Sequence, residues 1–157
     1  MQQITVNREL QLSYPNGFHK MSNDELSRLH FIEAGDGLCL SDPERHMIIS
    51  IGWKQIGLFV KLLLNPRDLA KNMEARIEKP LQSFGYQLKE RLEKTLDGKQ
   101  AKGIRYTYSA KDIDMMGESY VIRSDKIIYY LNVYFREAMA SESLAVWHDS
   151  LASVRWI

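Results

Sequence analysis

Cysteine, proline and long apolar runs are scarce in this chain. The only cysteine, Cys39, cannot form an internal disulfide, and a solitary cysteine is more typical of a reducing compartment than of an oxidising one. The most apolar stretch, residues 56–64, contains Gly57 and Lys61 and is far shorter than the roughly 20 residues of a membrane-spanning helix. The first ten residues lack the apolar segment of a secretory signal. The sequence therefore predicts a cytoplasmic protein without a membrane span.

An excess of charge of either sign is also lacking. Lysine and arginine total 21 against 20 aspartate and glutamate residues, a net charge of +1. Such a balance creates no strong field to attract phosphate backbones or anionic lipids, so we expect no nucleic-acid or membrane partner. Hydrophobic residues make up 45% and charged residues 26% of the chain, which is typical of a folded globular protein. A length of 157 residues fits one domain, residues 1–157.

The hydrophobic periodicity predicts the order strand, helix, strands, helix, strands, helix. The predicted elements are a strand at 4–12, a helix starting at the Ser22 capping box, a hairpin of 38–40 and 46–54, a helix at 65–84, a four-strand antiparallel meander of 86–96, 101–109, 117–123 and 126–135, and a helix from 141 onward. Separate runs of strands and helices favour the α+β class over a doubly wound parallel sheet.

The helix at 65–84 has the clearest signals. Asn65 can cap its start and Pro66 fits the first helical position, where the missing amide hydrogen costs nothing. Apolar residues then recur at helical spacing on one face: Leu69, Met73, Ile77, Leu81 and Phe84. Pro80 removes a backbone hydrogen bond near the end, so we expect the last turn to be bent or separate.

The last predicted strand is apolar on both faces. Tyr129 and Leu131 alternate with Ile128 and Tyr130, whereas a sheet with one wet face needs only one apolar set. The sequence therefore predicts an α/β/α sandwich, in which helices flank both faces of a central antiparallel sheet.

This order of elements, with the Tyr14-Pro15-Asn16-Gly17-Phe18 turn after the first strand and the closing helix from Ser143-Leu144 to Ser153-Val154-Arg155, resembles the PsbP-like superfamily. The superfamily includes the Ran-binding import factor Mog-one, the photosystem PsbP proteins and bacterial DcrB-type proteins. The resemblance implies an antiparallel sheet between helices and, since most members are not enzymes, a non-enzymatic function. It assigns no functional residue, because no subfamily motif matches particular positions.

Catalytic and metal-binding patterns are weak. Ligand-type residues gather in the N-terminal third, namely His19, His30, Cys39, Asp42 and His46, but no zinc or EF-hand spacing connects them. The neighbours His148 and Asp149 point apart on a helix and form no dyad on their own. We therefore predict no catalytic residue, no metal site and no cofactor, although a weak divalent-ion contact at Asp112 and Asp114 stays open.

The best binding candidates are a polar loop and exposed aromatic residues. Asp42, Glu44, Arg45 and His46 form a charged, proline-stiffened run that either contacts a partner or only closes a hairpin. Trp53 and Tyr134 could anchor a partner or a flat ligand if they are exposed. The predicted function is a non-enzymatic module that binds an unknown protein, as a monomer or a homodimer. The alternative is a small-molecule-binding protein or enzyme with a groove between the sheet and the 65–84 helix, lined by Trp53 and tyrosines.

Overall fold

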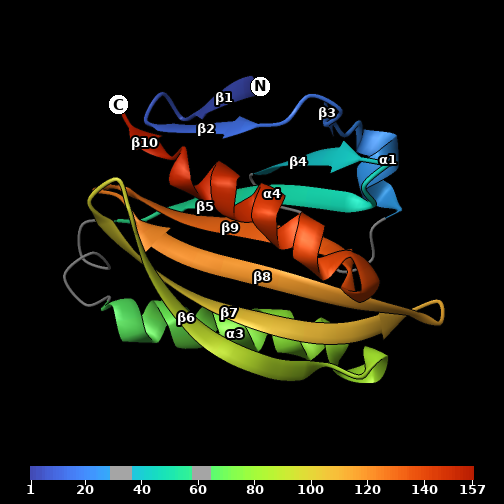
Figure 1. Cartoon of the computed structure of the whole chain (residues 1–157). Helices are drawn as coiled ribbons and strands as arrows, with labels where there is room; N and C mark the ends of the chain where they lie inside the picture. Colours follow the sequence, from blue (N-terminus) through green and yellow to red (C-terminus); the bar gives the residue numbers. More distant parts are fainter. Residues whose placement is uncertain (29–36, 58–64) are drawn as a thin grey trace.

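In the computed structural model, the described residues are 1–28, 37–57 and 65–157, and they form two antiparallel sheets with three α-helices (Figure 1). The strands are β1 (Gln2–Val6), β2 (Leu10–Tyr14), β3 (His19–Lys20), β4 (Gly37–Asp42), β5 (Met47–Gln55), β6 (Gln87–Leu96), β7 (Lys99–Ala110), β8 (Ile113–Arg123), β9 (Ile127–Arg136) and β10 (Arg155–Trp156). The helices are α1 (Asn23–Ser27), α3 (Pro66–Leu81) and α4 (Ala140–Ala152), with 3-10 turns η1 (Gln82–Phe84) and η2 (Glu137–Met139).

The larger sheet has the strand order β3-β4-β5-β9-β8-β7-β6. The strands β6 to β9 pair with their neighbours along the chain, and β5 joins through β9. The predicted α+β class, the large antiparallel sheet and the four-strand meander are therefore confirmed.

The prediction of one strand over residues 4–12 is wrong, because the chain reverses there. Asn7 and Arg8 adopt left-handed backbone angles with φ of 53° and 60°, and β1 pairs back on β2 from Val6 opposite Leu10. Three residues separate these partners, so the apolar even-numbered positions stay on one side through the turn. Hydrophobic periodicity alone therefore could not reveal the turn between β1 and β2. The small sheet is completed by β10, whose Trp156 lies opposite Leu10, a pairing the sequence did not predict.

The predicted caps are present. At the start of α1 the Ser22 hydroxyl accepts from the Glu25 amide, and the Glu25 carboxylate accepts from the Ser22 amide. The Asn65 side chain accepts from the Asp68 amide at the start of α3. Pro80 lies in the last turn of α3, and the chain then tightens into η1, as a lost backbone hydrogen bond predicts. None of the helices in the described ranges is both long and apolar enough to cross a membrane.

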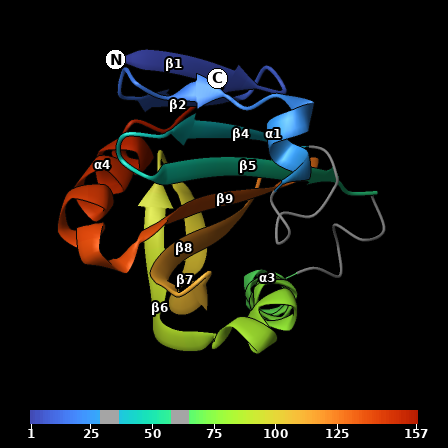
Figure 2. The ribbon, with the colours of Figure 1, turned by 90° about the vertical axis from the view of Figure 1, so that its right-hand side faces the viewer.

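Alternating residues of the large sheet contribute to two hydrophobic clusters. Tyr129 and Leu131 of β9 share one cluster with Trp147 of α4, whereas Ile128 of β9 shares the other with Leu69 of α3. Figure 2 shows α3 and α4 at separate places along the curved sheet. Burying each large side chain stabilises the fold by about 1.5–3 kcal/mol. A layer of helices alone was predicted on this side of the sheet, but strands β2 and β10 also contribute to the hydrophobic cluster that contains α4.

Candidate functional site

A buried carboxylate on β8 forms the main polar cluster of the larger sheet. Glu118 is 0% exposed, and residues of the same alternation on β8, Tyr120 and Ile122, belong to the apolar cluster shared with α4. A charge in such surroundings is costly unless it is paired and hydrogen-bonded. The partners of Glu118 therefore determine what this site can do.

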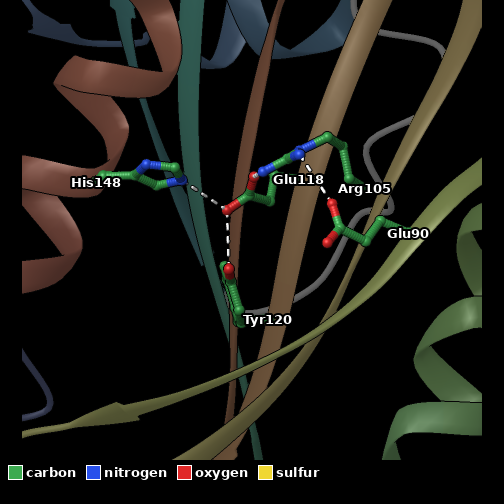
Figure 3. Close-up of polar contacts among 5 residues, drawn as sticks. All are labelled: Glu90, Arg105, Glu118, Tyr120 and His148. Carbon is green, nitrogen blue, oxygen red and sulfur yellow. Dashed lines mark hydrogen bonds and ion pairs between the residues drawn. The ribbon is translucent and has the colours of Figure 1, made fainter.

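Both carboxylate oxygens of Glu118 are occupied (Figure 3). Oε2 accepts hydrogen bonds from Arg105 Nε at 3.1 Å and Nη2 at 3.0 Å. Oε1 accepts from the Tyr120 hydroxyl at 2.9 Å and lies 3.3 Å from His148 Nε2. The ring nitrogen must carry its proton to donate here. Glu118 thus joins an ion pair, a hydroxyl and an imidazole.

Strand register places the charged residues in one row. Arg105 lies directly opposite Glu118 on one side and Glu90 on the other, and its Nη1 donates to Glu90 Oε2 at 3.0 Å. Opposite charges at facing positions of neighbouring strands attract each other. The row runs across β6, β7 and β8, and His148 reaches it from α4.

A glycine positions the hydroxyl of Tyr120. Gly103 lies opposite Tyr120, and a Cβ atom at residue 103 would come within 2.5 Å of Tyr120 Cδ1. The ring can therefore lie across β7 only where no side chain stands. Burial, and then the charge of Glu118, raises the pKa of Tyr120 well above its ordinary value. The hydroxyl consequently stays protonated and keeps donating to Glu118.

This arrangement is suited to holding α4 on the sheet rather than to chemistry. A general acid or base must be within reach of the reacting proton, and Glu118 is fully covered with both oxygens bound. The His148 side chain is 38% exposed, but its Nε2 faces Glu118. We therefore describe these residues (Glu90, Arg105, Glu118, Tyr120 and His148) as the Glu118 cluster and assign it a structural role.

The predicted polar loop is the β4–β5 turn, and its first residue points inward. Asp42 is 2% exposed; its Oδ1 accepts from the amides of Glu44 and Arg45, and its Oδ2 pairs with the Arg45 guanidinium. Burial alone would raise the pKa of the Asp42 carboxyl, but the hydrogen bonds and charge of Arg45 and the Glu44 amide together lower it. Glu44 and His46 remain exposed.

The β2–β3 turn is attached to this loop. Gly17 has a φ of +109°, and a Cβ atom there would lie 2.8 Å from Asp42 Oδ2. Arg45 Nη1 also lies 3.5 Å from the Asn16 carbonyl oxygen. A glycine is needed both for the backbone angle and for the close approach. Arg45, which pairs with Asp42, thus links the two neighbouring turns.

The two aromatic candidates do not form one exposed surface with this loop: Tyr134 lies opposite Ile48, two residues after the loop, and Trp53 lies farther along β5, opposite Tyr129. Tyr134 is 8% exposed and belongs to the cluster under α3, so the condition of exposure is not met. Burial, followed by the neighbouring Tyr106 and Tyr108, raises its pKa well above the ordinary value. Trp53 is partly buried against the cluster shared with α4. The structure therefore does not bring the six predicted residues into one site.

The predicted ligand-type residues of the N-terminal third are also dispersed. His19 pairs with Glu25 at 2.9 Å, Cys39 is buried, and His30 lies outside the described residues. Within the described ranges no group of three or more His, Cys, Asp or Glu side chains is placed to hold a metal ion. Asp112 lies in the β7–β8 turn, and Asp114, in β8, accepts from the Ser109 hydroxyl.

A groove lies between the start of α3, the start of β7 and the end of β8. It has a volume of about 390 Å³, and its lining residues are Asn65, Pro66, Leu69, Lys99, Gln100, Lys102, Val121 and Arg123. The predicted alternative site also lay between the sheet and this helix. The lining, however, is basic and aliphatic, without Trp53 or the tyrosines of that hypothesis.

Sequence reasoning missed the Glu118 cluster. One signal was present: in the alternation of β8, Glu118 stands between Met116 and Tyr120, which is a charge at a core position. Its partners Arg105 and His148 are 13 and 30 residues away, and a single sequence does not show which distant charges meet. The absence of a dyad between His148 and Asp149 stays a prediction; the structure places His148 Nε2 3.3 Å from Glu118 Oε1.

Comparisons with known proteins identify the fold. No protein-family model and no curated protein sequence matches the chain. Among solved structures it is similar to the cyanobacterial PsbP protein CyanoP of Synechocystis sp. PCC 6803, with a TM-score of 0.71 and 13% identity over 99% of this chain and 92% of that one. The fold is therefore PsbP-like, as the sequence resemblance predicted.

Two further structures support this conclusion. LpqN of Mycobacterium tuberculosis, described as involved in cell envelope biogenesis, has a TM-score of 0.60 and 14% identity over 94% of this chain and 82% of that one. A Pseudomonas aeruginosa protein of unknown function, PA94, described as a putative regulator, has a TM-score of 0.51 and 14% identity over 98% of this chain and 94% of that one. Identities this low establish the fold alone.

Proposed function

We propose that this protein is a non-catalytic binding module of PsbP-like, α/β/α architecture. The observation that carries the proposal is the closed Glu118 cluster. Both oxygens of the fully buried carboxylate are hydrogen-bonded to Arg105, Tyr120 and His148, so neither is available to a substrate. The membership of α3 and α4 in separate hydrophobic clusters supports the layered architecture. Because the Glu118 cluster leaves no open carboxylate oxygen, we infer that the protein acts by holding another molecule.

The proposed partner is a protein that contacts the β4–β5 turn, residues 42–46. Asp42 holds this turn from inside, so Glu44 and His46 are presented on a backbone that is already ordered. Preorganisation lowers the entropic cost of binding, and charges of both signs provide electrostatic complementarity. Trp53 and Tyr134 are omitted from the proposed interface because both are at least partly buried.

Site-specific photo-crosslinking in the native host tests this interface. A photoreactive residue at position 44 or 46 should produce a discrete adduct, and the same residue at Lys89, exposed on β6, should not. Asp42→Asn, which loosens the turn without changing its exposed side chains, should reduce the yield. Adducts at neither position, or equal adducts at all three, would contradict the proposal.

The proposed location is the cytoplasm, and the proposed state is a monomer. The buried, unpaired Cys39 supports a reducing compartment. The outer strand β6 supports the monomer, because it carries Lys89, Glu90 and Arg91 and a register irregularity between Leu88 and Glu90. Charges and bulges of this kind prevent pairing between sheet edges. Cell fractionation would test the first proposal, and a native mass of twice the chain mass would replace the second with the homodimer.

A further inference from the structure

Strand β1 has an open outer edge. The order of the small sheet is β1-β2-β10, so in the described part of the chain β1 pairs with β2 alone. Both ribbon views place β1 on the outside of the molecule (Figure 1 and Figure 2). The open edge of a strand is a row of amide and carbonyl groups that matches another extended chain. The ligand that fits this edge is therefore an extended polypeptide segment.

The register shows which backbone groups of β1 face outward. Val6 lies opposite Leu10, and its carbonyl oxygen accepts from the Glu9 amide at 3.1 Å, so the backbone groups of Val6 face β2. Residues of an antiparallel strand alternate between those that bond to the partner strand and those that do not. Gln3 and Thr5 consequently direct their N–H and C=O groups outward, and both residues are exposed.

The other outer strands are protected against added strands, whereas β1 is not. Strand β6 carries charges and a register irregularity, β3 has only two residues, and the outward amide of β10, at Trp156, donates to Asp97 Oδ2 at 2.8 Å. Strand β1, by contrast, pairs in continuous register over Gln2–Val6, a segment without charge or proline. Charges, bulges and prolines are the usual protection of an edge. Among the described strands, β1 is thus the one suited to accept another strand.

The first residue of β1 adjoins the turn that touches the proposed protein interface. Gln2 Nε2 donates to the Phe18 carbonyl oxygen at 3.2 Å. Arg45 of the β4–β5 turn has its Nη1 3.5 Å from the Asn16 carbonyl oxygen. The segment 15–18 between β2 and β3 therefore links the β1 edge to the β4–β5 turn. A protein bound at residues 42–46 lies next to an edge that can hold part of its chain.

We propose that the protein partner contributes an extended segment that pairs with the outer edge of β1 as an added strand. The inference rests on the proposed function, because it describes how the same partner is held. The segment exchanges backbone hydrogen bonds with Gln3 and Thr5, and its side chains alternate between the two faces of the sheet. Ile4 is partly buried against the apolar cluster, so the side chains beside it are apolar, and those beside Gln3 and Thr5 are small and polar.

A blocked peptide of alternating threonine and valine, with a lysine at each end for solubility, tests whether the edge accepts a strand. Added to ¹⁵N-labelled protein, it should shift the amides of Gln3 and Thr5 saturably, with a Kd of about 10 mM or tighter, and slow their exchange with solvent. The amide of Lys89, on the charged edge of β6, should not change. The same peptide with N-methyl groups on its central amides should not bind, because it lacks the donors. Equal shifts with both peptides, or no saturable shift with the first, would overturn the proposal.

Proline substitution tests the edge from the side of the protein. Thr5→Pro removes an outward N–H but no hydrogen bond to β2, a change that an edge strand tolerates, and it should weaken peptide binding at least about tenfold. Thr5→Val keeps the N–H and should bind like the unsubstituted protein. Equal binding by Thr5→Pro would overturn the proposal. A native dimer that Thr5→Pro dissociates would also overturn it, because a second copy would then occupy the edge. The comparison of the two peptides does not depend on whether this variant folds.

The same variants separate this inference from the proposed function in the native host. Thr5→Pro should reduce the adduct formed by a photoreactive residue at position 44 or 46 about tenfold, whereas Thr5→Val should not. An undiminished adduct with Thr5→Pro would overturn the added strand and leave the proposed interface at the β4–β5 turn standing.

Discussion

Two glutamates bind the same arginine, and their comparison measures what burial adds to an ion pair. Arg105 donates to Glu118 Oε2 and to Glu90 Oε2, each at 3.0 Å. Glu118 is 0% exposed, whereas the Glu90 side chain is 55% exposed. The substitutions Glu118→Gln and Glu90→Gln remove the same charge and keep almost the same volume. The difference between their losses in the free energy of unfolding therefore measures the effect of burial.

The two variants should lose amounts of unfolding free energy that differ severalfold. Removing one partner of a buried pair costs about 3–5 kcal/mol, and Glu118→Gln should reach about 3 kcal/mol because Arg105 keeps Glu90. An exposed pair contributes about 0–1 kcal/mol, so Glu90→Gln should lose less than about 1 kcal/mol. For a chain of this size, the first loss corresponds to a decrease in Tm of roughly 6–12 °C.

Urea denaturation followed by circular dichroism measures both losses as shifts of the midpoint at constant m-value. Salt should reduce the Glu90 contribution more than that of Glu118, because exposed charges are screened more strongly. Equal losses for the two variants, or a loss below about 1 kcal/mol for Glu118→Gln, would refute the structural role assigned to the Glu118 cluster.

Three further predictions concern a turn, a glycine and a thiol. The pKa of the Asp42 carboxyl is lowered in the fold, so the ionised carboxylate stabilises the folded state by about 1–3 kcal/mol. This stabilisation is present above the ordinary pKa of aspartate and is lost as the pH falls through the lowered pKa. Asp42→Asn should remove this pH dependence of unfolding, and an unchanged acid transition in the variant would contradict the prediction. Gly103→Ala should destabilise by about 1–3 kcal/mol through its clash with Tyr120, whereas the matched control Gly57→Ala, which meets no atom within 4 Å, should change the melting temperature little. Burial raises the pKa of the Cys39 thiol, so a thiol reagent should label it at the rate of opening, and fast labelling of the folded protein would refute its burial.

Local signals predicted much of the fold. The Ser22 and Asn65 caps and most of the apolar stripe of residues 69–84 depend on neighbours within a few positions, and the structure has them where the sequence predicts. The exception is Phe84, which lies in η1 beyond the helix and is 42% exposed. The meander was predictable because its strands pair in chain order. These features need no knowledge of distant contacts.

Of the features that sequence reasoning missed, one is a local turn without the usual signal and the others depend on distant pairing. The β7–β8 turn is only Lys111 and Asp112, both with positive φ, and no glycine marks it. The groove lies between the sheet and α3, as the alternative hypothesis predicted, but its lining comes from α3, β7 and β8, and composition cannot reveal which residues meet there. The sequence pointed instead to aromatic residues such as Tyr134, whose bulk and strand propensity indicate a core position as readily as a binding position.

The pairing of β2 with β10 has a consequence for how the chain folds during synthesis. Leu10 and Trp156 are partners, so the first hairpin gains its third strand only after residues 155–156 have left the ribosome. The β6–β9 meander can form earlier from neighbouring segments, whereas closing so long a loop is slow. Leu10 and Leu12, which end up fully buried, also share their hydrophobic cluster with Trp147 of the late helix α4. The N-terminal hairpin is therefore expected to be the last part of the molecule to become protected and the part most dependent on chaperones.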